Sequence, residues 1–220
     1  MTRVNDYLIL LEESDDERED KKRQRQFVYR FRMKPESFWS IIRYFGEQYP
    51  KENARGWSLI IEILVFLRWI TSGSTFTMVA DTFDMPLQSI SDIISRILPK
   101  FSRMARLMIN LPDEEELEEI AKNFRNIVGT DVFSHVAKTN DGSLIKLTPP
   151  LSERDQSINR KGNAFLNMTI ICDHKSRVRR LHWGYPGSSH DSFVLMNSGF
   201  SKKRLPPHPC MILGDDAYRV

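Results

Sequence analysis

A change in hydrophobic spacing halfway along the chain constrains the fold more than any other feature of the sequence. In the first half, apolar residues recur at helical spacing over residues 27–45, 57–70 and 76–83, and then from Pro86 to about residue 98. Pro99 is expected to end the last of these helices, because proline lacks the N–H that a helix interior needs. The first half is therefore predicted to be helical.

In the second half, the apolar residues gather in short runs rich in β-branched side chains. Strands are predicted over residues 141–147, 166–173, 178–183 and 210–214, with a helical stretch from His190 or Asp191 to Met196 before the last strand. The order β, β, β, α, β is that of the start of a ribonuclease-H-like domain, although other α/β layouts begin in the same way. The predicted fold class is α+β, with a helical helix-turn-helix region followed by a ribonuclease-H-like α/β domain.

Charge divides the chain into four parts. Residues 21–110 hold 15 basic and 7 acidic residues, a net charge of +8, and residues 120–220 hold 15 and 8, a net charge of +7. Acidic segments precede both parts. We therefore expect a charged, flexible lead-in over 1–26, a helix-turn-helix-like domain over 27–110, an acidic connector over 111–125 and the α/β domain over 126–220.

Two basic domains are typical of proteins with a polyanionic partner, and ordinary solvated surface charge is the alternative. The two cysteines, Cys172 and Cys210, exclude a disulfide framework and a cysteine-based zinc site, which suits a reducing compartment. The longest apolar stretch, residues 58–70, contains Glu62 and Arg68 and falls short of the roughly 20 residues that a membrane span needs. No membrane partner is expected.

Residues 76–98 have the proportions of a helix-turn-helix, with Asp84 and Met85 in the turn. Six apolar residues are predicted to pack inward: Val79, Ala80, Phe83, Ile90, Ile93 and Ile94. Gln88, Ser89 and Ser91 then lie on or near the exposed side of the second helix, beside Asp92, as candidates for DNA contact. The alternative is a small helical bundle that touches no DNA. The basic run Lys21, Lys22, Arg23 and Arg25 is a candidate nuclear-import signal or phosphate contact.

Two aspartates occupy positions at which catalytic carboxylates can converge. Asp141 falls on the first predicted strand and Asp215 at the carboxyl end of the fourth, and these strands are neighbours in a ribonuclease-H-like sheet. Converging carboxylates are ligands for Mg²⁺ or Mn²⁺, and a pair of such ions supports phosphodiester displacement. Acids at strand ends also serve as caps or salt-bridge partners, and this alternative stays open.

Four ordered motifs resemble those of the Harbinger-type transposase family and of the nucleases domesticated from it. They are NDGSLIKLTPP at 140–150, NRKG at 159–162 followed by FLNMTIICD, WGYPGSSHDSFVLMNSGF at 183–200 and MILGDDAY at 211–218. The helical half is similar to the helix-turn-helix region of this family. The resemblance implies a metal-dependent endonuclease or strand-transfer core that uses two aspartates and one glutamate with Mg²⁺ or Mn²⁺.

Carried over by motif, Asp141 is the first catalytic carboxylate and metal ligand, and Asp215 the second. Asp191 matches another acid of the family, either a metal ligand or the N-cap of the helix that it opens. Asp216 stands where the family usually has serine. Arg160 and Lys161 are candidate nucleic-acid contacts, with a solvated basic loop as the alternative. The resemblance also implies DNA as partner, a nuclear location and a separate Myb-like DNA-binding protein.

The sequence departs from the family pattern in two places. The third acid, a glutamate on a later helix, is expected beyond Tyr218, so we expect the α/β domain to be incomplete within this chain. Residues 131–139 have the character of an insertion before Asp141, and Asp131 with His135 is a second candidate for the first acidic motif. Asp141 is preferred because the residues after it continue the motif.

Three functional hypotheses follow from these observations. The first is a nuclear, metal-dependent DNA nuclease of transposase descent. The second is a non-enzymatic DNA- or protein-binding module of the same descent. The third is a product without a stable fold after residue 130.

Overall fold

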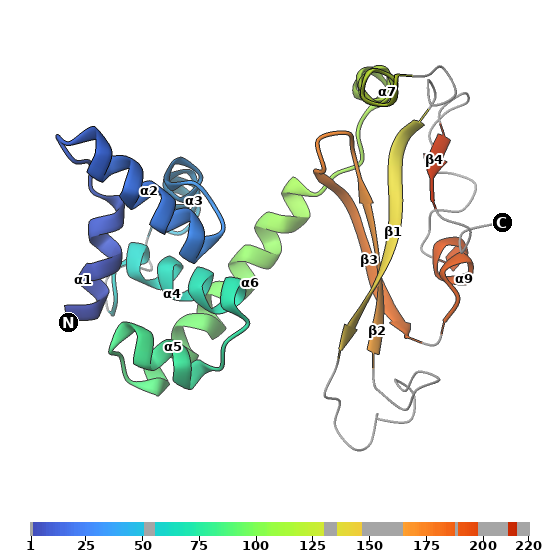
Figure 1. Ribbon diagram of the computed structural model, residues 1–220. Coiled ribbons are helices and arrows are strands. Elements are labelled where there is room, and N and C mark those ends of the chain that lie inside the picture. Colours follow the sequence, from blue (N-terminus) through green and yellow to red (C-terminus); the bar gives the residue numbers. More distant parts are fainter. Residues whose placement is uncertain are drawn as a thin grey trace. The chain divides into compact units, whose positions relative to one another are not determined.

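The computed structural model describes residues 2–50, 56–129, 136–146, 165–187, 189–197 and 211–214. The chain divides into two compact units, Met1–Ala105 and Arg106–Val220 (Figure 1). The first unit is helical and the second is built around a sheet, so the predicted α+β class is confirmed.

Helices α1 to α6 make up the first unit. Their bounds are α1 Thr2–Leu8, followed by the short 3₁₀ helix η1 Ile9–Leu11, then α2 Glu17–Phe31, α3 Pro35–Gln48, α4 Leu59–Ser72, α5 Phe76–Phe83 and α6 Leu87–Met108. Pro35 opens α3, because proline is well suited to the first position of a helix.

The flexible lead-in predicted for residues 1–26 is wrong. Tyr7 of α1 is buried and stacks on Phe83, with 4.8 Å between the ring centroids. Phe27 and Phe31 anchor α2 in the same core, and the carboxylate of Asp16 caps the helix by accepting the N–H of Arg18 at 2.9 Å. The charged start of α2 is helical because it is capped and continuous with two buried phenylalanines.

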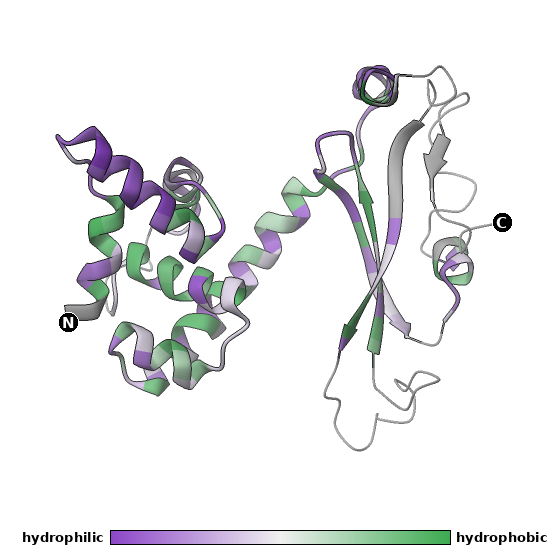
Figure 2. Ribbon diagram, in the orientation of Figure 1, coloured by the Kyte–Doolittle hydropathy of each residue, from purple (hydrophilic) through white to green (hydrophobic). Residues whose placement is uncertain are grey.

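Helix α4 forms the apolar centre of the first unit. Residues 63–67 are all buried, and Figure 2 shows α4 as mostly hydrophobic. Glu62, which begins this buried stretch, forms an ion pair with Arg96 of α6, so its charge is compensated. Among the described helices, none combines the length and the apolar character that crossing a membrane requires.

The helix, turn and second helix predicted from residue 76 onward are present, and both helices begin within one residue of the expected positions. The hydroxyl of Thr75 caps α5 by accepting the N–H of Met78 at 3.3 Å, and Asp84 ends α5 in the left-handed conformation with φ at 55°. The six residues predicted to pack inward are all buried: Val79, Ala80, Phe83, Ile90, Ile93 and Ile94.

Pro99 does not end α6, which corrects the sequence prediction. The helix continues to Met108 because residues after Pro99 pack on the core. The ring of Phe101 stacks on Phe66 with centroids 4.4 Å apart and meets Phe45 at 4.9 Å. The ammonium of Lys100 lies 4.6 Å from the ring centroid of Tyr49. These contacts outweigh the hydrogen bond that a proline removes from a helix interior.

The second unit contains a four-stranded sheet in the order β3-β2-β1-β4. Its strands are β1 Val136–Lys146, β2 Phe165–Cys172, β3 Val178–Pro186 and β4 Met211–Leu213. Strands β1, β2 and β3 pair antiparallel, whereas β4 pairs parallel with β1. This order and these directions are those expected for the start of a ribonuclease-H-like sheet. Strand β1 begins earlier than predicted, so residues 136–139 of the expected insertion belong to it.

The acidic connector predicted over residues 111–125 is instead largely helix α7, Glu114–Val128, which packs on β1. Asp113 caps it by accepting the N–H of Glu116 at 2.8 Å. Three side chains of the helix are buried: Leu117, Ile120 and Ala121. Acidic residues favour a helix N-terminus, because the helix dipole is positive there. The acids of this segment therefore begin a helix rather than form a solvated link.

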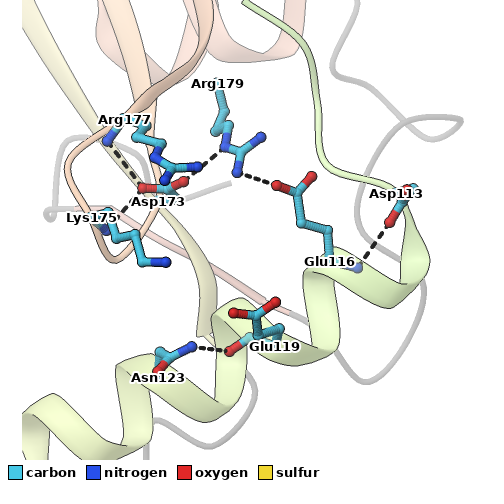
Figure 3. A network of polar contacts seen from close by, with 8 residues as sticks. All are labelled: Asp113, Glu116, Glu119, Asn123, Asp173, Lys175, Arg177 and Arg179. Atoms are coloured by element: carbon cyan, nitrogen blue, oxygen red, sulfur yellow. Dashed lines mark hydrogen bonds and ion pairs between the residues drawn. The ribbon is translucent and has the colours of Figure 1, made fainter. Parts of the chain in front are cut away.

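A buried ion-pair chain joins α7 to the β2–β3 hairpin (Figure 3). Asp173 accepts the backbone N–H groups of Lys175 and Arg177 at 2.9 and 3.0 Å, and the Nε–H of Arg179 at 2.8 Å. Arg179 also donates to Glu116 of α7. Burial alone raises the pKa of Asp173, but the donors from Arg177, Arg179 and Lys175 outweigh it and hold the pKa below its ordinary value.

We expect Asp173→Asn to destabilise the second unit at pH 7 by about 2–4 kcal/mol, because it removes a buried charge partner of Arg179. A lowered pKa stabilises the fold above the ordinary aspartate value, about 3.9, and this contribution is lost as pH falls through the folded value. The difference between wild type and variant should therefore shrink on acidification. Hydrogen exchange of β2 and β3 amides at pH 7 and pH 3.5, corrected for intrinsic rates, measures this difference in the second unit alone.

The control for this experiment is Glu118→Gln, which removes an exposed carboxylate from α7. It should leave exchange nearly unchanged at both pH values. A constant difference between wild type and Asp173→Asn from pH 7 to 3.5 would contradict the depressed pKa.

Substitutions of Pro99 and of Phe101, both within α6, should change the stability of the first unit in opposite directions. Pro99→Ala should stabilise it by about 1–2 kcal/mol, because Pro99 is exposed and alanine restores an intrahelical donor. Phe101→Ala should destabilise it by about 2–4 kcal/mol through lost ring packing. Urea unfolding followed by tryptophan fluorescence measures both changes. Destabilisation by Pro99→Ala would mean that the helix needs a break at this residue.

Candidate active site

The predicted first catalytic carboxylate, Asp141, lies on β1 between β2 and β4. Its side chain is exposed, and its Oδ1 accepts the N–H of Gly142 at 2.8 Å. Asp141 faces Ile170 across the antiparallel pairing with β2. The carboxylate of Asp141 therefore lies on a central strand and is open to solvent.

The pairing of β1 with β4 shows which residue of β1 lies beside the last described residue of β4. The register joins Val136 to Met211, Lys138 to Ile212 and Thr139 to Leu213, where the described part of β4 ends. Asp215, Asp216, Arg160, Lys161, Asp131 and His135 all lie outside the described residues. Their predicted roles stay predictions.

Asp191, the other acid of the matched motifs, opens α9, Asp191–Leu195. His190 is the N-cap residue, so the N-cap alternative for Asp191 is wrong by one position. The Oδ1 of Asp191 accepts the Nδ2–H of Asn167 at 2.9 Å, and Asn167 also donates to the carbonyl of Ser189 at 3.5 Å. This carboxylate therefore joins the start of α9 to β2.

The sheet separates Asp141 from Asp191. Residues paired across antiparallel strands share a face, and successive residues of a strand alternate between faces. Asp141 pairs with Ile170, and Asn167 pairs with Leu144, three residues further along β1. Asn167 and its partner Asp191 are therefore on the face opposite Asp141. The geometry favours a structural role for Asp191, and the described residues do not bring the two acids together.

Glycine is required in the turn before α9 by close backbone approach. A Cβ on Gly187 would lie 2.7 Å from the Cβ of Phe165, and the Gly187 N–H donates to the Phe165 carbonyl at 2.8 Å. Ser189 closes the turn by donating its N–H to the carbonyl of Pro186 at 2.9 Å. Gly187 and Ser189 of the PGSSHD segment thus shape the turn that leads from β3 into α9.

A row of buried polar side chains under α9 was missed by the sequence analysis. Asn167 and Thr169 are 3% and 2% exposed, and Thr169 pairs with His182 of β3. Asn167 Oδ1, Thr169 Oγ1 and His182 Nε2 are buried without a hydrogen-bond partner among the described residues. Burial, reinforced by the charge of Arg180, lowers the pKa of His182. The available signal was polar residues at alternate positions in the otherwise apolar FLNMTIIC strand.

The nucleic-acid contacts predicted on α6 lie in an acidic setting. Gln88 is exposed, but its Nε2 donates to the carboxylate of Asp92 at 2.8 Å. Ser89 and Ser91 are half-buried. Residues 76–98 include three aspartates and one arginine, Arg96, which is paired with Glu62. DNA contact by this helix stays a prediction, and the local charge does not favour it.

The described residues contain no group of three or more histidine, cysteine, aspartate or glutamate side chains placed to hold a metal ion. The one predicted ligand that the structure describes at the centre of the sheet is Asp141. Its exposed carboxylate fits the oxygen ligands that Mg²⁺ and Mn²⁺ prefer.

Comparisons with known proteins agree with the motifs. Residues 140–220 match the family described as DDE superfamily endonuclease. The chain is 26% identical over 172 residues to "Putative nuclease HARBI1" of Rattus norvegicus, covering 77% of this chain and 48% of that protein. It is 28% identical over 156 residues to "Protein ALP1-like" of Arabidopsis thaliana, covering 70% and 37%.

The human "Putative nuclease HARBI1" is 26% identical over 155 residues, covering 70% of this chain and 44% of that protein. The chain thus spans about half the length or less of these curated relatives. No solved structure matches the chain. Residues 140–220 therefore carry a DDE superfamily endonuclease domain, and the four motifs and these relatives make the chain similar to the Harbinger transposase-derived nucleases.

Proposed function

We propose that this protein is a divalent-metal-dependent nuclease that acts on DNA phosphodiester bonds in the nucleus, with Asp141 and Asp215 as its metal-binding carboxylates. The observation that carries the proposal is the position of Asp141, exposed on the strand that pairs with both β2 and β4. The DDE superfamily endonuclease domain supports the reaction class.

The strand register supports pairing Asp141 with Asp215. The described pairing of β1 with β4 ends at Thr139 and Leu213. In the sequence, Asp141 follows Thr139 by two residues, just as Asp215 follows Leu213. The register is irregular between Val136 and Lys138, but from Lys138 to Thr139 both strands advance by one residue, and residues two positions apart on a strand share a face. We therefore propose that the two carboxylates meet at one level of the sheet.

Each residue has a distinct part in the proposed mechanism. Asp141 supplies a carboxylate whose Oδ1 is oriented by the Gly142 N–H, so its remaining lone pairs are directed by the strand and not by a mobile loop. A bound Mg²⁺ or Mn²⁺ would neutralise phosphate charge and lower the pKa of the attacking water. Asp191 and Asn167 hold α9 against the far face of the sheet and thereby support the strands that carry Asp141.

The metal part of the proposal is tested by titrating Mn²⁺ into the chain while following thermal unfolding. At a free Mn²⁺ concentration of 100 times the dissociation constant, binding to the folded state should add about 2.7 kcal/mol of stability. Asp141→Asn should abolish the added stability, because it removes one of two proposed anionic ligands. Asp191→Asn, on the other face, should retain it.

The opposite pattern, with the response lost in Asp191→Asn and kept in Asp141→Asn, would place the metal on the α9 side of the sheet. Asp191→Asn also tests folding. It weakens a hydrogen bond to Asn167 and should lower the melting temperature in the absence of metal.

The reaction is tested by nicking of supercoiled plasmid in the presence of Mn²⁺. We expect Asp141→Asn to reduce nicking at least about 100-fold, since loss of one group that stabilises transition-state charge typically costs that much. Glu118→Gln, an exposed carboxylate change on α7, should cut as wild type does. Nicking that persists in EDTA would rule out the metal-dependent mechanism. A folded chain that binds Mn²⁺ and DNA without nicking would instead be a binding module.

A further inference from the structure

Helix α2 presents a basic face that the nuclease site does not use. At 3.6 residues per turn, one side of the helix collects residues spaced by three, four and seven positions. We call this side the α2 basic face, and it consists of Arg18, Lys21, Lys22, Arg25 and Tyr29 on the helix, together with Arg32, the left-handed residue that ends it. All six side chains are exposed. Phe27 and Phe31 point to the opposite side, where both are fully buried. The helix is thus held by its apolar side and leaves a cationic side free.

The charge of this face is concentrated and one-signed. Residues 21–35 contain seven lysines and arginines and no aspartate or glutamate. Arg18, Lys21, Lys22 and Arg25 line one shallow hollow together with Gln26. Figure 2 shows α2 as hydrophilic along most of its length. The helix dipole attracts cations only in the last turn, so it does not account for Lys21, Lys22 and Arg25 near the middle.

Ion pairs within α2 neutralise only part of this charge. Lys21 contacts Glu17 at 2.5 Å and Lys22 contacts Glu19 at 3.5 Å. In both pairs each side chain is more than 40% exposed, and exposed pairs of this type contribute little and exchange readily for other partners. A phosphate can therefore replace either acid at small cost.

We propose that the α2 basic face docks on the phosphate backbone of duplex DNA. This inference rests on the proposed function, which makes DNA the substrate. From Arg18 to Arg32 the face rises through 14 residues, roughly 21 Å at 1.5 Å per residue. That length spans about six base pairs of a duplex at 3.4 Å per step. Four of its cations lie between Arg18 and Arg25 and a fifth, Arg32, lies at its far end, so the face can contact several phosphates of one duplex.

Other polyanions fit this face less well. A membrane surface binds helices whose apolar side is available for insertion, but here that side is buried in the core. Single-stranded nucleic acid is bound by open aromatic platforms. The face has one aromatic residue, Tyr29, and the guanidinium of Arg32 lies over its ring at 5.7 Å from the centroid. The side chains on offer are those that contact phosphates without reading bases.

The test is fluorescence anisotropy of a labelled 20-base-pair duplex with the 220-residue chain in EDTA, from 50 to 300 mM NaCl. The variant Lys21→Gln/Lys22→Gln/Arg25→Gln removes three charges from the face. The matched control Arg43→Gln/Arg103→Gln/Lys122→Gln removes three exposed charges from other helices. A second face variant, Arg18→Gln/Arg32→Gln, leaves the ion pairs with Glu17 and Glu19 intact, and circular dichroism checks folding of all three.

Wild type should bind with a steep salt dependence, and each lost phosphate contact should reduce the slope of log K against log[NaCl] by about 0.9. The triple face variant should therefore lose about 2–3 in slope and bind at least tenfold more weakly at 100 mM NaCl. Arg18→Gln/Arg32→Gln should lose about 1–2. The control should change affinity less than threefold with nearly unchanged slope.

Equal weakening by the face and control variants would overturn the proposal, because net charge would then explain binding. An unchanged face variant would also overturn it. Poly-glutamate or a single strand that competes as well as unlabelled duplex at equal charge would assign the face to another polyanion. EDTA prevents metal-dependent cleavage during this assay, so binding is measured separately from the nicking of plasmid in Mn²⁺. Docking without nicking in the Mn²⁺ assay would contradict only the nuclease proposal, and nicking there without these binding effects would contradict only the docking proposal.

Discussion

The pairing of β1 with strands on both of its sides is the constraint on which the second unit depends. An unbroken antiparallel register with β2 runs from Thr139 to Lys146, and β4 adds a parallel register on the other edge. A shift of one residue would move Asp141 to the face of Asn167, because side chains alternate along a strand. The bond from Asn167 to Asp191 and the burial of Ile171 fix which face of β2 lies against α9, and both oppose such a shift.

The same sheet gives two motif acids different roles. The carboxylate of Asp191 is committed to Asn167 at the start of α9, whereas that of Asp141 bonds only to its neighbouring backbone N–H among the described residues. A carboxylate already bound by a buried amide stabilises packing, and an exposed one on a central strand is available to a cation. A motif match alone cannot separate these roles, because both acids stand in segments of equal resemblance. The pairing register separates them.

The sequence allowed the helical first half, the strand order and the inward residues of α5 and α6 to be predicted, because each depends on local periodicity. It failed where distant contacts override local composition. Residues 1–26 were expected to be flexible because so many of them are charged, yet Tyr7 of α1 is buried, and Phe27 and Phe31 anchor α2 in the core. Pro99 was expected to end α6, yet Phe101 packs on Phe66 beyond it. For the site, the position of Asp141 was predictable from motif and strand, but the bond from Asn167 to Asp191 was not, since 24 residues separate the two.

The charge distribution moves the expected DNA contacts of the helical unit from the predicted helix-turn-helix to α2. A helix-turn-helix that reads DNA needs donors on its second helix. Residues 76–98 supply three aspartates and one arginine, Arg96, which is paired with Glu62, and Gln88 is bonded to Asp92. The cations lie on α2, which sequence composition alone had assigned to a flexible segment. A rigid row of phosphate contacts without base-reading side chains gives affinity but little sequence preference. If α2 holds the duplex, selection of a target site must therefore come from other residues or from another protein. The separate DNA-binding protein implied by the resemblance to the Harbinger-type family would supply such selection.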